Sequence, residues 1–286
     1  MDLKHLPRYP LHNQYLQIEA LTEGGLRLIA LRLPDSTQNL LAESPDNHWP
    51  TPYGEYYLLG GHRLWVAPEI PEQTYIPETG KIQVEEIGNG LRLTAAIEEP
   101  TGLQKSIHIQ PDPQHPALDI THIIANRGTS PIEVSAWAIT ALPLGGTAIL
   151  PQPIGPSDGL QPNRHLVLWP YTRIQDRRLK LNDDWITLQA IPSLPACKIG
   201  YLNTHGWIAY QRNGVLFVKR FETHANQTYP DRNCNVEVYC NDMLIELETL
   251  SPSVCLSAGA STTYTERWEI YQGESLPPEF DFPSAQ

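Results

Sequence analysis

Short segments in which apolar and polar residues alternate with a period of two run through most of this chain. Such alternation is typical of β-strands that bury one face and expose the other. Convincing long amphipathic helices are absent, while 27 prolines, 13 tyrosines and 7 tryptophans favour many short strands joined by loops. The sequence therefore predicts an all-β fold.

Two pairs of alternating segments are separated by turn residues. Residues 15–20 and 26–33 are joined through Gly24-Gly25, which predicts an opening hairpin. Residues 118–124 and 132–137 are joined through a stretch that contains Asn126-Arg127-Gly128, which predicts a second hairpin.

Strand signals of the same style continue at residues 198–202, 206–210 and 215–221. The proline-rich stretches 44–52 and 151–162 have such signals on both sides, so we interpret them as extended loops and not as domain linkers. We therefore expect a single domain over residues 1–286, with an irregular tail at 274–286.

A third predicted hairpin, between Asn235 and Leu250, carries three glutamates on one face. With Asn241-Asp242 as a two-residue turn, Glu237 would lie opposite Glu246 with Glu248 alongside. Like charges placed across strands destabilise a sheet, so we expect a nearby cation, a raised carboxyl pKa or an open cleft for a polyhydroxylated ligand. A solvated outer face is the simpler alternative, and a longer turn would change the register.

A second dense segment follows Gly60-Gly61, whose flexible backbone delivers His62 and Arg63 side by side. Trp65 shares a strand face with Arg63. An imidazole can act as an acid or base near pH 7, a guanidinium can hold a carboxylate or hydroxyls, and an indole can support the apolar face of a sugar. The combination suits polyol recognition. The alternative is a turn into a core strand, with His62 satisfied by the backbone and Arg63 in a salt bridge.

Three further residues are candidates for buried or site positions. Lys219 shares an alternating face with Val215, Phe217 and Phe221, so either the lysine points inward or that face is the outer one. An inward lysine needs an acid, which the glutamate hairpin downstream would offer. Trp137 would line a cleft, although a tryptophan in a β-protein is more often part of the core. His122 alternates with isoleucines, which indicates a satisfied buried histidine.

Composition excludes several classes of function. A formal net charge of −12 disfavours nucleic acid and anionic lipid as partners. The start of the chain lacks a secretion signal and no stretch approaches a transmembrane length, so the expected location is cytoplasmic. The 4 cysteines show no CxxC spacing and are interpreted as reduced thiols. No HExxH pair, phosphate loop or metal-spaced cluster is present, so no metal site is predicted.

Three segments resemble the galactose-mutarotase-like superfamily. Residues 25–31, followed by Asn39-Leu40-Leu41, resemble its first hairpin. Residues 123–128 with Pro131 resemble the strand and turn that precede one of its histidines. The most specific match is Leu247-Glu248-Thr249, followed by Pro252, Leu256, Gly259 and Trp268.

The resemblance implies an antiparallel supersandwich with a sugar cleft on a concave face, a small-molecule sugar as ligand and no cofactor. By the match, Glu248 stands at the position of the general base, while Ala260 stands where a loop glutamate is usual. His62 is our candidate acid, although the family's glycines follow its first histidine and here they precede it. Trp137 occupies the neighbourhood of the second histidine.

The sequence thus predicts an aldose 1-epimerase-like protein that opens a sugar ring by acid-base chemistry. Glu248 and His62 are the expected catalytic residues. The expected substrate-binding residues are Arg63, Trp65, Trp137, Lys219, Glu237 and Glu246. The alternatives are a non-catalytic carbohydrate-binding module of the same fold, and a lyase or hydrolase in which Arg63 and Lys219 hold the carboxylate of an acidic glycan.

Overall fold

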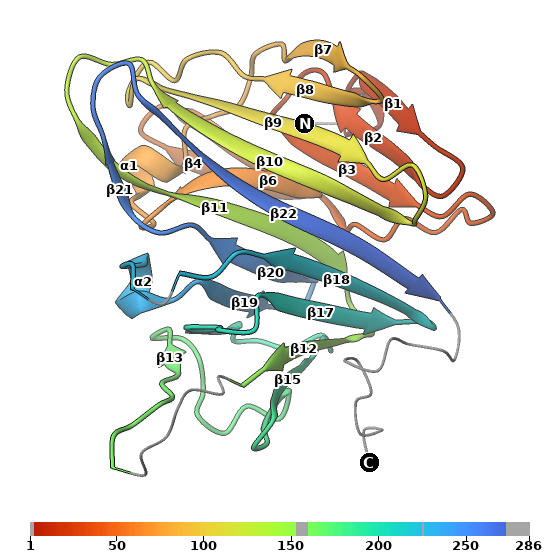
Figure 1. Cartoon of the computed structure of the whole chain (residues 1–286), viewed down its shortest axis with the longest axis vertical. Coiled ribbons are helices and arrows are strands. Elements are labelled where there is room, and N and C mark those ends of the chain that lie inside the picture. The colour runs from red at the N-terminus through yellow and green to blue at the C-terminus, as the bar shows by residue number, and fades with distance from the viewer. Residues whose placement is uncertain (1–2, 153–159, 225, 273–286) are drawn as a thin grey trace.

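The computed structural model describes residues 3–152, 160–224 and 226–272. The described chain forms two ten-stranded antiparallel sheets and a separate two-stranded hairpin, which confirms the all-β prediction (Figure 1). The expected irregular tail, 274–286, and part of the proline-rich stretch 151–162 lie outside the described residues.

The first sheet, which we call the site sheet, carries the glutamate hairpin near one end. Its strands are, in spatial order, β1 (Arg8–His12), β2 (Gln17–Leu21), β3 (Arg27–Arg32), β6 (His62–Ala67), β11 (Ile132–Pro143), β20 (Leu244–Leu250), β19 (Val236–Cys240), β16 (Cys197–Tyr201) and β13 (Val167–Leu168). One further strand, β21 (Val254–Leu256), pairs with the first residues of β11.

The second sheet, which we call the back sheet, packs against the site sheet. Its strands are, in order, β14 (Leu179–Leu181), β15 (Trp185–Gln189), β12 (Thr147–Pro151), β17 (Trp207–Arg212), β18 (Val215–Phe221), β22 (Ser261–Gln272), β10 (Ala117–Asn126), β9 (Leu103–Pro111), β8 (Gly90–Thr94) and β7 (Gln83–Ile87). The separate hairpin joins β4 (Glu43–Thr51) to β5 (Gly54–Gly60). The helical segments are η1 (Leu3–His5), α1 (Pro71–Thr74) and α2 (Pro230–Asn233), and no described helix is long and apolar enough to cross a membrane.

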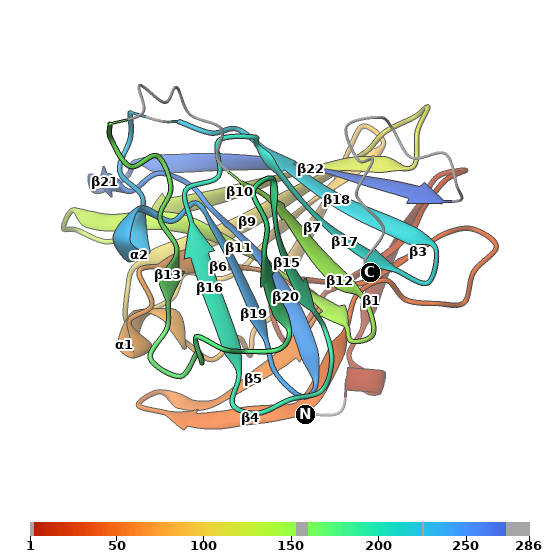
Figure 2. The ribbon, with the colours of Figure 1, turned by 90° about the horizontal axis from the view of Figure 1, so that it is seen from below.

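The molecule has three layers. In Figure 2 the back sheet lies above, the site sheet lies in the middle, and the β4–β5 hairpin lies beneath it. Apolar side chains from the inner faces of both sheets fill the space between the sheets, as the alternation requires. A second apolar cluster joins Tyr56 and Leu58 of the hairpin to Trp65 and Trp137 on the outer face of the site sheet. Both faces of the site sheet are therefore covered, and any opening on its outer face must lie beside the hairpin.

The structure confirms the opening hairpin but not the second one. β2 and β3 pair antiparallel, with a bulge after Glu19. By contrast, β10 belongs to the back sheet and β11 to the site sheet, so the chain crosses between the layers after Asn126. The Asn126 amide donates to the carbonyl oxygens of Ser130 and Leu256 and its oxygen accepts from the amide of Gly128, which fixes the crossing. Alternation and turn residues do not distinguish such a crossing from a hairpin.

The glutamate hairpin forms, but its register differs from the prediction by two residues. Glu237 lies opposite Glu248, and Tyr239 lies opposite Glu246. Asn241 bonds to Leu244 at the base of the turn, and its side chain accepts from the amides of Met243 and Leu244. The two turn residues are therefore Asp242 and Met243. A shift of two preserves the face of each side chain, so the three glutamates still share one face.

Candidate functional site

A pocket of about 570 Å³ opens on the outer face of the site sheet, beside the β4–β5 hairpin. We call it the central pocket. Its lining includes four of the six residues expected to bind substrate, namely Arg63, Trp65, Trp137 and Glu246, together with the expected base Glu248. Its volume lies within the range of small-molecule sites.

Strand register brings these residues together. Arg63 and Trp65 alternate on β6, and their direct neighbours on β11 are Ile139 and Trp137. Ile139 in turn lies opposite Glu248 on β20. Because the side chains of directly paired residues point to the same face, the guanidinium and the carboxylate reach the same concavity from strands that are far apart in sequence.

The Arg63 guanidinium is held by Glu246. Nη1 donates to Oε1 at 2.7 Å and Nη2 donates to Oε2 at 3.3 Å. The guanidinium carbon also lies 4.0 Å from the centre of the Trp65 ring. Burial opposes the charge of Arg63, but Glu246 more than offsets this and raises the arginine pKa. The guanidinium is thus held by two hydrogen bonds to Glu246 and by its packing against the Trp65 ring.

A second cation, Lys198 on β16, lies between the other two glutamates. Its ammonium is 2.7 Å from Oε2 of Glu237 and 3.0 Å from Oε2 of Glu248. The indole Nε1 of Trp137 donates to the same Glu248 oxygen at 2.8 Å. The rings of Trp137 and Trp169 each lie 4.6 Å from the ammonium. Lys198 is thus a nearby cation, one of the three alternatives expected to offset the crowding of the glutamates.

The electrostatics of this cluster are set by burial. Glu237 is fully buried, and burial raises its pKa well above the usual range although Lys198 opposes the shift. Burial also raises the pKa of Glu248, again against Lys198. Burial alone would lower the pKa of Lys198, but Glu248 and Glu237 together raise it well above normal. Lys198 therefore stays protonated, and Glu237 is the carboxyl that most readily keeps a proton.

We expect Glu237→Gln to flatten the loss of stability with rising pH. Because the folded protein retains a proton on Glu237 above the ordinary carboxyl pKa of 4.5, where the unfolded chain has lost it, stability falls as pH rises through that window. Urea denaturation between pH 5 and 8 measures this, and the stability of the variant relative to wild type should increase with pH. The control is Glu85→Gln, at an exposed side chain. Parallel curves for wild type and Glu237→Gln would contradict the prediction.

Aromatic side chains form much of the pocket wall. Besides Trp65 and Trp137, the lining contains Trp49, Tyr75, Tyr171 and Tyr239. Tyr75 packs edge-on against both Trp49 and Trp65, at ring separations of 5.1 and 5.3 Å. Aromatic walls around buried carboxylates and two cations suit a ligand that has apolar ring faces and many hydroxyls.

Lys219 does not reach this pocket. It points between the two sheets, where its ammonium lies 2.9 Å from Oε1 of Glu266 and donates to the carbonyl oxygens of Ala138 and Leu247 at 3.1 and 3.2 Å. Of the two alternatives for Lys219, the structure shows the inward one, but the acid that pairs with it is Glu266 and not a residue of the glutamate hairpin. Lys219 thus joins the back sheet to two strands of the site sheet.

His62 also lies on the inner face, because it precedes Arg63 on the same strand. Its Nε2 is 2.8 Å from Nε2 of His122, and its Nδ1 is 3.0 Å from the Thr140 hydroxyl. His122 Nδ1 faces the Tyr264 carbonyl oxygen at 3.0 Å and must donate to it. His122 Nε2 then accepts from His62, and His62 Nδ1 accepts from Thr140. Burial lowers the pKa of both histidines, which agrees with two neutral rings.

This geometry separates His62 from Glu248, so we do not retain it as the acid of the central pocket. Among the described residues, His62, His122 and Glu266 have ligand atoms within 4.8 Å of one another, a spacing compatible with a metal ion. However, each imidazole nitrogen has a partner, and the Glu266 carboxylate already binds Lys219 and the Trp268 indole at 2.9 and 3.0 Å. The cluster fits a completed hydrogen-bond network better than a metal centre.

Sequence reasoning missed Lys198, Tyr239, Tyr171 and Tyr75. For Lys198 one signal was present, because Gly200 interrupts the same strand face. A Cβ on Gly200 would lie 3.1 Å from Cγ of Glu237 and 2.9 Å from Sγ of Cys234. Glycine in a strand marks a close approach, and here it makes room for Glu237 beside Lys198. The pairing of β16 with β19, however, has no signature in the sequence.

Neither protein-family models nor curated proteins match the chain in sequence. Solved structures match it in three dimensions. A galactose mutarotase-like protein from Lactobacillus casei has a TM-score of 0.59 at 9% identity, covering 93% of this chain and 100% of that chain. The chain has the galactose mutarotase-like fold. The supersandwich that the sequence resemblance implied is thereby confirmed.

Two other solved structures are similar to this chain. A candidate aldose 1-epimerase from Escherichia coli has a TM-score of 0.58 at 13% identity, covering 93% of this chain and 99% of that chain. A TPR-domain containing protein from Parabacteroides distasonis has a TM-score of 0.65 at 14% identity, covering 98% of this chain. This chain spans only 50% of that longer protein. At these identities the likeness establishes the fold, which is one used by carbohydrate-related proteins, and not an activity.

Proposed function

We propose that this protein interconverts the anomers of a free sugar by acid-base opening of the ring. The observation that carries the proposal is the pairing of Glu248 with Lys198, at 3.0 Å, inside an aromatic pocket. A carboxylate and an ammonium held side by side give a proton acceptor and a proton donor in one concavity. Ring opening of a hemiacetal needs both.

In the proposed reaction, Glu248 accepts the proton of the anomeric hydroxyl while Lys198 donates a proton to the ring oxygen. The bond between the anomeric carbon and the ring oxygen breaks, and an open-chain aldehyde forms. Rotation presents the other face of the aldehyde, and the reverse proton transfers close the ring. Both residues return to their starting states, so the cycle is balanced without a cofactor.

The neighbouring residues support these two roles. Glu237 lies directly opposite Glu248, and its carboxyl oxygen is 2.7 Å from the Lys198 ammonium, which it helps to hold in position. The Trp137 indole donates to Glu248 and fixes the orientation of the carboxylate. Arg63 and Glu246 form one polar side of the pocket, and Trp65 backs the guanidinium. We assign Trp137, Trp65, Arg63 and Glu246 to substrate binding.

The charge balance of the central pocket favours an uncharged sugar. Its two lining cations are both engaged, Arg63 by Glu246 and Lys198 by Glu237 and Glu248. Glu69, on the pocket wall, accepts from the Tyr75 hydroxyl and adds another carboxylate. A phosphate or uronate group would lie close to these carboxylates and be repelled by them. The described lining has no cation left unpaired to offset that repulsion.

Magnetisation-transfer NMR on a panel of free sugars tests the proposal. We expect acceleration of anomer exchange for at least one neutral aldose, and rates at least about tenfold lower for the matching sugar 6-phosphate and uronic acid. Equal or faster exchange of the charged sugars would contradict the charge argument. Failure to accelerate exchange of any sugar would contradict the proposed activity.

A non-catalytic carbohydrate-binding protein is the second candidate. It is favoured by one observation, which is that the described lining of the central pocket contains no histidine. This candidate predicts saturable binding of sugars with no acceleration of anomer exchange. The acidic-glycan alternative loses its basis, because Lys219 lies between the sheets and Arg63 is bound to Glu246.

A further inference from the structure

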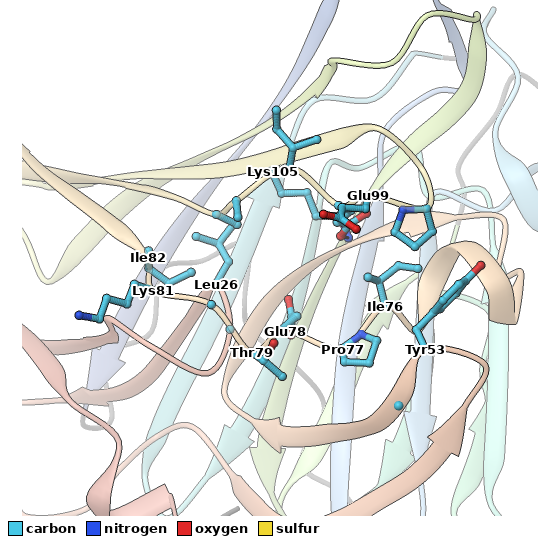
Figure 3. A pocket seen from close by; sticks show the side chains of 18 of the residues that line it. Leu26, Tyr53, Ile76, Pro77, Glu78, Thr79, Lys81, Ile82, Glu99 and Lys105 are labelled. Carbon is cyan, nitrogen blue, oxygen red and sulfur yellow. Dashed lines mark ion pairs between the residues drawn. The ribbon is translucent and has the colours of Figure 1, made fainter.

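A second pocket, of about 720 Å³, lies on another side of the β4–β5 hairpin, and we call it the side pocket. Its walls come from the segment after α1, the loop between β8 and β9, the tip of the hairpin and the turn before β3. In Figure 3, Leu26 and Ile82 lie to one side of Glu78, while Ile76, Pro77 and Tyr53 lie to the other. The proposed function makes no use of this pocket.

Buried hydrogen-bond donors without partners lie close behind the wall of the side pocket. Arg27 is fully buried, and its Nε and Nη1 have no partner among the described residues. A Cβ on Gly25, which lines the pocket, would lie 3.3 Å from that Nε and 2.9 Å from an oxygen of Glu78. The Arg27 guanidinium, which is not itself part of the lining, therefore lies directly behind Gly25 and Glu78 of the cavity wall. Unpartnered buried donors are costly and call for an acceptor.

The acceptor is not expected to be an anion. The carboxylates on the pocket wall are Glu55, Glu78, Glu98 and Glu99. The lysines on the wall are Lys81 and Lys105, and the Lys105 ammonium is already 2.6 Å from Glu98. A negatively charged ligand would meet more like charges than free cations. A hydroxyl group of a neutral ligand suits both Arg27 and Glu78, because its oxygen can accept from Arg27 while its proton is donated to Glu78.

The remaining wall is suited to the apolar face of a sugar ring. Tyr53 is 45% exposed at the hairpin tip although it lines the cavity, and Leu26, Ile76 and Pro77 lie nearby. An exposed aromatic ring beside carboxylates and orphaned donors combines stacking area with hydroxyl recognition. From this arrangement we propose that the side pocket is a second binding site, for a neutral saccharide, separate from the central pocket.

The two pockets are joined by a short chain of buried contacts. Arg27 forms an ion pair with Glu78 and donates to the Tyr56 hydroxyl at 2.9 Å. The Trp65 indole donates to the same hydroxyl at 2.8 Å, and Trp65 lines the central pocket. The sites are close in structure but share no lining residue, so each can be altered without removing a wall of the other.

Backbone amide NMR on the full chain tests this proposal with maltose, lactose and glucose as probes. We expect one saturable set of shifts at Gly25, Thr79 and Gly80, and a second set at Tyr239 and Asn241. Tyr53→Ala should weaken binding measured by the first set about tenfold and leave the second set unchanged. Leu181→Ala, at an exposed apolar side chain that lines neither pocket, is the control.

The outcomes separate the two sites. Failure of the side-pocket amides to shift with any probe, or full retention of their affinity in Tyr53→Ala, would overturn the second site. Glu78→Gln supplies an independent variant, whose fold is checked by its amide spectrum. It should also lower the sugar affinity measured from the shifts at Gly25, Thr79 and Gly80. Because none of these readouts depends on anomer exchange, the second site can fail or stand whether or not the central pocket is catalytic.

Discussion

Glu248→Gln is expected to abolish the acceleration of anomer exchange while preserving the fold. A positioned general base typically contributes about 100- to 10,000-fold, and glutamine cannot accept the proton of the anomeric hydroxyl. The amide oxygen can still accept from the Trp137 indole, as the carboxylate oxygen does at 2.8 Å. Exchange rates by magnetisation-transfer NMR, at equal protein concentration, measure the loss.

Glu133→Gln is the matched control, because Glu133 is an exposed glutamate on β11, the strand that also carries Trp137. It should leave the exchange rate unchanged. If Glu248→Gln retained the full rate, Glu248 would have no part in the reaction. If instead wild type bound sugars without accelerating exchange, the carbohydrate-binding alternative would stand.

Lys198→Met is expected to lower the free energy of unfolding by about 3 to 5 kcal/mol, as well as removing the proposed proton donor. The substitution leaves Glu237 and Glu248 facing each other across β19 and β20 without the cation that lies within 3.0 Å of both. Buried carboxylates then repel or must take up protons. Urea denaturation at pH 7 measures the change.

Adding Glu237→Gln to the Lys198→Met protein should recover part of that loss, since it removes one of the two unpaired carboxylates. Lys180→Met, at an exposed lysine of β14, serves as the control and should change stability by less than about 0.5 kcal/mol. A loss for Lys198→Met no larger than that of the control would show that the buried cluster does not depend on its cation.

Alternation in the sequence was sufficient to predict which residues share a face. It places Arg63 with Trp65, and Glu237 with Glu246 and Glu248. Of these, Arg63, Trp65, Glu246 and Glu248 line the central pocket, while Glu237 is buried opposite Glu248 and is not part of the lining. Alternation does not indicate which strands pair with one another, because strand pairing is determined by packing over the whole chain.

Two misplaced side chains show this limit. The position of Lys219 in the sequence suggests a partner in the glutamate hairpin downstream, whereas the structure pairs it with Glu266 on β22, the neighbouring strand of the back sheet. His62 was joined to Arg63 in one site, although consecutive strand residues point to opposite faces. His62 and Arg63 are consecutive on β6, so only Arg63 faces the central pocket. Lys198 could not be assigned to the site from the sequence, because no sequence pattern indicates that its strand, β16, pairs with β19.

The central position of β11 has a consequence for how the chain is made. β11 lies between β6 and β20, and the contact of Trp137 with Glu248 spans 111 residues. On the ribosome, one edge of this largely buried strand stays without its partner until residues 244–250 have emerged. An apolar open edge of that kind can pair with other chains. Truncated products that end before β20 are therefore expected to aggregate, and nascent chains of this length to depend on chaperones.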